Sequence, residues 1–439
     1  MATSKSALLL LLCLACSGWA QTLSTGRTVR RHRVQVSSVA PEVVRAEAAI
    51  DKKDYAAAER ELQAALKQDP NDYRTWFDLG FVYTATGRDA QAIEAYRKSV
   101  AADPKVFEAN LNLGLLLART GHPEAEKYLR AATGLKPSAR PDEGLARAWV
   151  SLGHVVEAKD PQQALAAFRR AAQLQPKDPE PHISAAMVAQ KMGDLATAEK
   201  EYQATADLDA KSSEALAGLI SVYVKTNRLP DAEAALRKYL ALDPHSAAAH
   251  LQLGRVLAAQ GKPDQALPEL ETGLRLAPDD ADTQRELASL YAKNKQYDKA
   301  EVQFRALVQK NPGDAGLHHG LGAVLMEQHK FPEAQPELLE AIKLDPGLGA
   351  AYGDLAVVAS ENKDYVLTIK ALEARARTLP ETPATYFLRA TAYDHLRNYE
   401  QAAANYHQFL LAAKGRFPDQ EWQARHRLIA IEPMKTMKK

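Results

Sequence analysis

The sequence predicts an all-α protein built as an α-solenoid, a stacked array of helix pairs. Three observations carry this prediction. Prolines recur every 34 residues over long stretches, small and large apolar residues recur in register with them, and each period contains one internal break. A chain of 439 residues also exceeds what one compact core usually holds, which favours a repeat array or several domains.

Residues 1–20 have the layout of a secretory signal peptide. Lys5 precedes an apolar run over residues 7–15, and small residues follow it. Residues 18–20 place glycine and alanine where a signal peptidase reads small side chains. We therefore expect cleavage before Gln21 and an exported protein, periplasmic or secreted, from a bacterium. An uncleaved apolar helix is the alternative.

Both cysteines, Cys13 and Cys16, lie in this leader, so the mature chain would have no thiol or disulfide chemistry. The tripeptide at residues 14–16 loosely resembles the end of a bacterial lipoprotein signal. In that alternative Cys16 is lipidated and the protein is a lipid-anchored assembly factor of an envelope complex at the outer membrane. Membrane association is expected in that case only.

Residues 21–38 form a basic segment that contains four arginines and no acid. We interpret it as a flexible linker; the alternatives are an anchor to an anionic lipid or polymer, or a segment that folds back over the binding groove. Loss of Lys5 with the leader brings the formal net charge from +1 to zero. A neutral chain gives no electrostatic reason to expect nucleic acid as a partner.

Residues 39–412 contain eleven repeats, which we number so that the recurring proline stands at position 32. This position holds the following residues, with Ala210 where one proline is missing: Pro70, Pro104, Pro137, Pro176, Pro244, Pro278, Pro312, Pro346 and Pro380. The spacing departs from 34 residues only around repeats 3 and 4, where two turns are shortened and residues 137–146 form a longer connection.

Small residues recur at positions 8 and 20, and large apolar residues at positions 7, 11 and 24, which is helical spacing. A break near positions 15–17, often at glycine, divides each repeat into two helices. Glycine inside a helix costs about 1 kcal/mol relative to alanine, so its recurrence at position 8 needs a compensating reason. We expect close packing of the two helices there, with Ala92 against the backbone of Gly80. The proline at position 32 ends the second helix.

One such repeat cannot bury enough apolar surface alone, so the repeats are expected to stack. The second repeat resembles the tetratricopeptide repeat signature nearly residue for residue, through the following set: Trp76, Leu79, Gly80, Tyr83, Ala92, Tyr96 and Pro104. The resemblance implies a right-handed superhelix of antiparallel helix pairs. It also implies that the first helices line a concave groove that binds peptides or protein segments.

The carboxyl-terminal residues 413–439 follow the last repeat. Pro418 can start a helix, and Trp422, Leu428 and Ile429 are predicted to cover the end of the array. The rest of this segment is predicted to be a basic tail.

No catalytic, cofactor-binding or phosphate-binding motif is present in the sequence. His182, His250 and His318 share repeat position 4 and are expected to pack in the core. His154 and Glu157 lie one helical turn apart, but two ligands do not make a metal site. We therefore expect no enzyme, no cofactor, no metal and no small-molecule substrate.

The resemblance places the candidate groove at positions 5, 6 and 9 of the first helices. The partner-binding residues predicted in this way are Phe77, Phe81, Leu111, Asn112, Leu115, Val150, His154, Ile183, Met187, Arg255, Arg285 and His319. The first half of this set is apolar and the later part is polar and partly basic. Exposed apolar side chains in a concavity usually indicate a partner.

One known binding mode of the family is not expected. Its clamp for carboxyl-terminal tails requires lysine at position 5 and asparagine at position 9, followed by asparagine at position 6 of the next repeat. Asn112 matches the last requirement, but Phe77 and Phe81 occupy the first two places. The sequence as a whole predicts a non-enzymatic scaffold that binds a protein or peptide in its groove.

Overall fold

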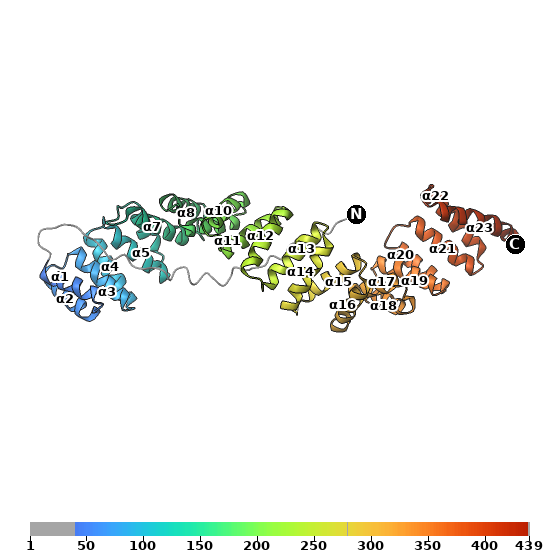
Figure 1. Cartoon of the computed structure of the whole chain (residues 1–439), viewed down its shortest axis with the longest axis horizontal. Helices are drawn as coiled ribbons and strands as arrows, with labels where there is room; N and C mark the ends of the chain where they lie inside the picture. Colours follow the sequence, from blue (N-terminus) through green and yellow to red (C-terminus); the bar gives the residue numbers. More distant parts are fainter. Residues whose placement is uncertain (1–39, 279, 438–439) are drawn as a thin grey trace. The chain divides into compact units, whose positions relative to one another are not determined.

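The computed structural model describes residues 40–278 and 280–437, and over these residues it contains 23 helices and no strand. Eleven consecutive helix pairs, α1 to α22, correspond to the eleven predicted repeats, and one further helix follows them (Figure 1). The predicted α-solenoid is confirmed.

The first helices of the repeats carry odd numbers: α1 (Pro41–Asp51), α3 (Tyr73–Ala85), α5 (Phe107–Arg119), α7 (Pro141–Val156), α9 (Pro179–Lys191), α11 (Ser213–Lys225), α13 (Ala247–Ala259), α15 (Ala281–Lys293), α17 (Ala315–Glu327), α19 (Gly349–Glu361) and α21 (Pro383–His395). The second helices carry even numbers: α2 (Tyr55–Gln68), α4 (Asp89–Ala102), α6 (Ala125–Thr133), α8 (Pro161–Leu174), α10 (Leu195–Leu208), α12 (Leu229–Leu242), α14 (Pro263–Leu276), α16 (Tyr297–Lys310), α18 (Phe331–Leu344), α20 (Tyr365–Ala376) and α22 (Tyr399–Ala413). The last helix is α23 (Pro418–Met437).

The helices belong to two compact units, an amino-terminal unit that ends at Pro244 with α12 and a carboxyl-terminal unit that begins at His245 with α13. Within each unit every helix packs against its neighbours in sequence, most extensively within its own repeat. The buried side chains form clusters that run through consecutive repeats instead of one central core. Each repeat therefore depends on its neighbours, as stacked arrays do.

The glycine at position 8 is explained by the large side chain at position 24 of the same repeat. A Cβ atom on Gly80 would lie 2.7 Å from the ring of Tyr96. The same relation, with distances of 2.6 or 2.7 Å, holds for Gly114 with Leu129, Gly153 with Phe168, Gly254 with Leu270 and Gly322 with Leu338. The predicted close approach is confirmed, but its partner was assigned wrongly, because Tyr96 and not Ala92 lies nearest to Gly80.

Positions 20 and 24 are buried in all eleven repeats. Tyr96 has no exposed surface, and this burial raises the pKa of its hydroxyl well above the usual range. Tyr83, at position 11, is buried in the same cluster, and the guanidinium of Arg88 lies 4.4 Å from the centre of its ring.

The turn between the two helices uses a left-handed residue at position 15 in every repeat except the fourth, whose turn is shortened. Four of these residues are glycines with φ between 72° and 81°: Gly87, Gly121, Gly193 and Gly261. Six are other residues with φ between 57° and 63°: Lys53, Asn227, Lys295, His329, Lys363 and Arg397. The predicted break near positions 15–17 therefore has a specific backbone geometry.

Side chains at position 4 also form hydrogen bonds to the preceding repeat. The indole Nε1 of Trp76 donates a hydrogen bond of 2.8 Å to the carbonyl of Pro70, the proline that ends the preceding repeat. Asn110 and Gln284 donate equivalent bonds to Pro104 and Pro278, at 3.0 Å and 2.8 Å. The recurring proline thus supplies a carbonyl that anchors the following helix.

The carboxyl-terminal helix covers the last repeat with a different face from the predicted one. Leu428 is buried as expected, together with Ala424 and Ile431. Trp422 and Ile429 are wrongly predicted, because they are 62% and 74% exposed. The buried residues follow a helical spacing of four and three, and a shift of one residue rotates a side chain by about 100° to the outer side.

The contact between positions 8 and 24 predicts the direction in which a larger residue at position 8 changes the stability of the protein. Replacement of Gly80 by Ala should destabilise the protein by about 1–3 kcal/mol, because the new methyl group meets a fully buried ring that has no room to move. Helix propensity alone would instead stabilise it by about 1 kcal/mol. Urea unfolding distinguishes the two, and a more stable Gly80→Ala variant would contradict the packing account.

Candidate functional site

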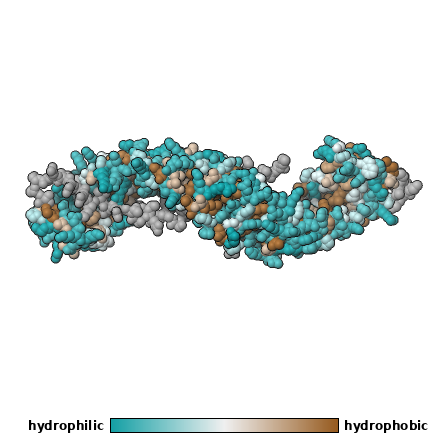
Figure 2. Space-filling view, viewed as in Figure 1, coloured by the Kyte–Doolittle hydropathy of each residue, from teal (hydrophilic) through white to brown (hydrophobic). Residues whose placement is uncertain are grey.

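The twelve candidate groove residues all lie on first helices, which we call the first-helix face. In the amino-terminal unit they come from α3, α5, α7 and α9, and in the carboxyl-terminal unit from α13, α15 and α17. Most of the visible surface of the chain is hydrophilic, with separate hydrophobic patches between the polar areas (Figure 2).

Four candidates are buried and do not present an exposed surface. Phe77 and Leu111 are 4% and 0% exposed, and Asn112 and Val150 are buried with them. The ring of Phe77 lies against Tyr96 with centroids 5.8 Å apart. The expectation of exposed side chains at these positions is wrong. Phe77, Leu111 and Val150 belong to packed clusters that include the first helix of the next repeat. A charge at Phe77 would therefore test stability, not binding.

Five candidates in the same unit remain half-buried: Phe81, Leu115, His154, Ile183 and Met187. The ring of His154 stands edge-on to Phe168 at 4.9 Å, and its Nδ1 lies 3.8 Å from Glu157. Ile183 and Met187 rest against the cluster around Tyr202, whose burial raises its pKa to about 12. These side chains pack on buried residues on one side and keep part of their surface in solvent on the other.

The polar candidates in the carboxyl-terminal unit are paired with acids that lie on, or cap, the first helix of the next repeat. Arg255 donates to Glu286 at 2.7 Å and also to Thr283 at 2.9 Å. Arg285 donates to Asp314 at 2.6 Å, and the Nε2 of His319 lies 2.8 Å from Asp354. The three basic residues were predicted from the sequence, whereas their acidic partners were not.

This pairing affects the ionisation of the acids, as the pKa of Asp314 shows. Burial opposes ionisation of Asp314, but hydrogen bonds from the Leu317 amide and from Arg285 outweigh it and hold the pKa of this carboxyl below its usual range. Asp314 also caps the amino terminus of α17. In the carboxyl-terminal unit the first-helix face is therefore a row of neutralised pairs, not the basic surface that its arginines suggest.

A second set of charge pairs joins each turn to the repeat before it, and we call these junction pairs. A cation at position 16 contacts an acid at position 21 of the preceding repeat in the following cases: Arg88 with Glu59 at 2.7 Å, Arg228 with Glu199 at 2.7 Å and Lys330 with Glu301 at 2.8 Å. Their regular spacing is visible in the sequence, although the sequence analysis did not use it.

No grouping of three or more His, Cys, Asp or Glu side chains suited to a metal ion occurs in residues 40–278 and 280–437. Of the three histidines that we expected to pack in the core, His318 is buried and His182 and His250 are half-buried. Each has Nδ1 2.7 Å from a glutamate of its own repeat, and these are Glu201, Glu269 and Glu337. Among the helices of the same ranges, none is long and apolar enough to cross a membrane.

Comparison with known proteins identifies the family. A family model described as Tetratricopeptide repeat matches residues 49–108, 224–293, 257–325 and 291–357, and a second model of that description matches residues 90–140 and 183–247. Together these stretches cover more than half of the chain, which therefore belongs to the tetratricopeptide repeat proteins. Members of this class are generally non-catalytic scaffolds for protein interactions. No curated protein matches the sequence.

Several solved structures are similar. YrrB, described as a tetratricopeptide repeat protein with an unusual peptide-binding site, is 25% identical over 43% of this chain and 96% of its own, with a TM-score of 0.39. PilF of Pseudomonas aeruginosa is 21% identical over 49% and 98%, with a TM-score of 0.40. Yeast Tom70 is 15% identical over 90% and 96%, with a TM-score of 0.33.

The junction pairs predict a pH dependence of stability. The hydrogen bond from Lys330 lowers the pKa of Glu301 from 4.5, and the side chain of Glu301 is only 14% exposed. A depressed pKa in the folded state means that this stabilisation is present above pH 4.5 and is lost as the pH falls through the folded value.

Replacement of Glu301 by Gln should therefore lower stability at pH 7 by about 1 kcal/mol and reduce the loss of stability between pH 4.5 and pH 3. Thermal unfolding midpoints at these pH values measure both effects. Glu340→Gln, in an exposed pair with Lys343, is the control and should change the midpoint at pH 7 much less. Equal effects of the two variants would contradict the assignment.

Proposed function

We propose that the protein is an exported scaffold that binds an extended segment of a partner protein along its first-helix face, as a concave groove would. The observation that carries this proposal is the row of half-buried apolar side chains Leu115, Ile183 and Met187 on α5 and α9. Each has exposed apolar surface whose further burial is worth about 25 cal/mol per Å².

The three side chains of this row pack against buried residues. Leu115 packs against the cluster that contains Phe168, and Ile183 and Met187 pack against the cluster that contains Tyr202. Side chains held in place lose little conformational entropy on binding, which favours recognition. Within the carboxyl-terminal unit, the paired charges on α13, α15 and α17 would contribute specificity for a partner more than affinity.

A triple variant tests the proposal. Replacement of Leu115, Ile183 and Met187 by Ser in the mature chain should weaken partner binding by roughly 100-fold, because three apolar contacts of about 1 kcal/mol each are lost. The measurement is affinity capture from envelope extract, with the captured proteins identified and quantified by mass spectrometry.

The matched control replaces three exposed apolar residues of second helices, Leu208, Leu242 and Leu276, by Ser. It should retain the partners that the wild type captures, and the thermal midpoints of both variants should be recorded beside the binding data. If the triple variant on the first-helix face keeps its midpoint and captures the same partners as the control, the proposal is wrong.

Export is proposed from residues 1–20, which lie outside the described residues. Intact mass and amino-terminal sequencing of protein made in a bacterial host should show a chain that begins at Gln21 and is found outside the cytoplasm. A Cys16→Ala variant should give the same mature chain. A lipid-modified chain that begins at Cys16, and that Cys16→Ala releases from the membrane fraction, would instead support the lipoprotein alternative.

A further inference from the structure

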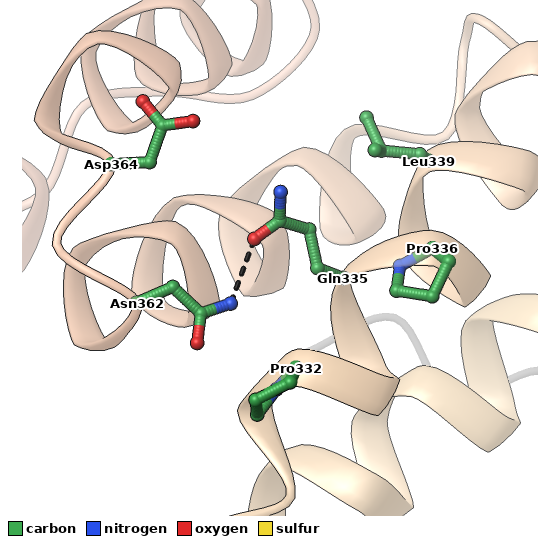
Figure 3. A pocket seen from close by; sticks show the side chains of 6 residues that line it. All are labelled: Pro332, Gln335, Pro336, Leu339, Asn362 and Asp364. Atoms are coloured by element: carbon green, nitrogen blue, oxygen red, sulfur yellow. Dashed lines mark hydrogen bonds between the residues drawn. The ribbon is translucent and has the colours of Figure 1, made fainter.

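The open hollow between α18 and the turn that leads into α20 is lined by side chains that already serve the fold (Figure 3). It has a volume of about 530 Å³. In its wall Asn362 donates a hydrogen bond of 2.7 Å to Gln335, and Asp364 caps the amino terminus of α20. The most exposed apolar residues of this unit lie elsewhere, mainly on its last two helices.

The last two helices, α22 and α23, carry three of the four most exposed large apolar side chains of the described chain. Ile429, Leu411 and Trp422 are 74%, 67% and 62% exposed. Val302, on α16, is the fourth. Side chains of this size and exposure that gather at one place indicate an interaction surface, whereas scattered ones do not.

Two of these side chains share one side of α23. Trp422 and Ile429 are seven residues apart, which places them two helical turns apart on the same side. His426 stands between them, and the centre of its ring lies 3.9 Å from that of Trp422. The buried residues of α23, which pack on the last repeat, lie on the other side: Ala424, Leu428 and Ile431.

Leu411 lies beside this row. The Nε2 of His407 on α22 is 2.8 Å from the Oε1 of Glu432 on α23, so these two residues mark where the edges of the helices meet. Leu411 is one turn from His407 and Ile429 nearly one turn from Glu432, both toward the turn that joins the two antiparallel helices. We call the following residues the terminal patch: Leu411, Trp422, His426 and Ile429.

An apolar outer side is unusual for the last helix of a repeat array. Terminal elements have a polar outer face, since no further repeat stacks on them. The first helix, α1, follows this rule, because its one exposed large apolar residue, Val44, is accompanied by exposed Arg45 and Glu47. The outer side of α23 instead carries Trp422 and Ile429, as the face of an internal helix would.

The charge around the terminal patch indicates the chemistry of a partner. Residues 413–439 contain seven Lys and Arg residues and three acids, whereas residues 40–412 contain 44 Lys and Arg residues and 52 acids. Lys414, in the turn before α23, is exposed, and so is Arg425, which pairs with Glu421 at 3.1 Å. Two such ends would repel each other, so this positive charge favours an anionic partner over a second copy of the chain.

The size of the terminal patch favours a lipid surface over an acidic protein. Three apolar side chains are few for a stable protein interface, which buries about 800 Å² on each partner. Adsorption to a bilayer needs less area, because attraction to anionic headgroups adds to the burial of apolar side chains. Tryptophan also suits the headgroup region, since its ring is apolar and its N–H is polar.

We propose that the terminal patch docks the protein on the surface of an anionic lipid bilayer. The apolar side chains of the patch enter the headgroup region, and the basic residues of 413–439 attract the headgroups. This contact uses α22 and α23 and no first helix, so it goes beyond the proposed function and does not depend on it. It also requires no lipid on Cys16.

Flotation with lipid vesicles tests the proposal on the mature chain that begins at Gln21. Phosphatidylcholine vesicles with about 30% phosphatidylglycerol should bind the protein at least about tenfold more strongly than pure phosphatidylcholine vesicles, because basic residues are attracted to an anionic surface. Sodium chloride at about 0.5 M should weaken this binding at least about fivefold. A protein that does not bind the anionic vesicles would overturn the proposal.

A pair of double variants assigns the contact. Trp422→Ser/Ile429→Ser should weaken binding to the anionic vesicles at least about tenfold. The matched control, Val302→Ser/Val366→Ser, changes two exposed apolar residues of second helices in the same unit and should bind like the wild type. All four residues are exposed, so the thermal midpoints should stay close to that of the wild type. Equal affinities of the two variants would mean that another part of the chain binds the lipid.

Fluorescence quenching locates the contact directly. The chain from Gln21 has three tryptophans, Trp76, Trp149 and Trp422. Anionic vesicles with brominated acyl chains should quench the emission of the wild type. Trp422→Phe keeps an apolar ring and should still bind, but most of the quenching should disappear. Unchanged quenching in this variant would contradict the proposal.

Sedimentation velocity without vesicles distinguishes a lipid surface from a second copy of the chain. The wild type and the Trp422→Ser/Ile429→Ser variant should sediment alike, because the terminal patch makes no contact between copies. A wild-type dimer that the variant converts to monomers would show that a second copy covers the patch, and the proposal would be wrong.

Discussion

The contact between the large side chain at position 24 and the residue at position 8 joins the two helices of a repeat, and position 8 is small in every repeat except the sixth, where it is Ile220. In five repeats position 8 is a glycine whose missing Cβ makes room for a buried ring or leucine. The accompanying cost in helix propensity is about 1 kcal/mol per glycine, which the burial of a large side chain offsets. The stacking of repeats, the position of each turn and the faces left for partners all depend on this contact.

Because the packing positions are shared by all repeats, function has to reside in the positions that differ. On the first-helix face these are half-buried apolar residues in the amino-terminal unit and cross-repeat charge pairs in the carboxyl-terminal unit. A partner gains little from a charge that is already paired, so the apolar row is the better source of affinity and the pairs are the better source of specificity.

Sequence reasoning located the eleven repeats, their turns and the start of the last helix, because each depends on local patterns that recur many times. It failed where contacts between repeats decide the outcome. Phe77 and Leu111 were placed correctly on first helices, but neighbouring first helices cover them. Trp422 and Ile429 were predicted to lie on the face of α23 that covers the last repeat. They lie on the exposed side, because they are one residue away from the positions that face the repeat. The acids opposite the basic groove residues lie on, or cap, the first helix of the following repeat.

The sequence by itself determined the class of fold, since a 34-residue period with helical spacing inside it permits only stacked helix pairs, and family comparison agrees. It also determined which positions are apolar and packed within a repeat, although the close partner of Gly80 is Tyr96 and not the predicted Ala92. Only the tertiary structure decided which face residues stay exposed and which charges find partners. Those properties depend on side chains about 30 residues apart, whose distance is set by how one repeat stacks on the next.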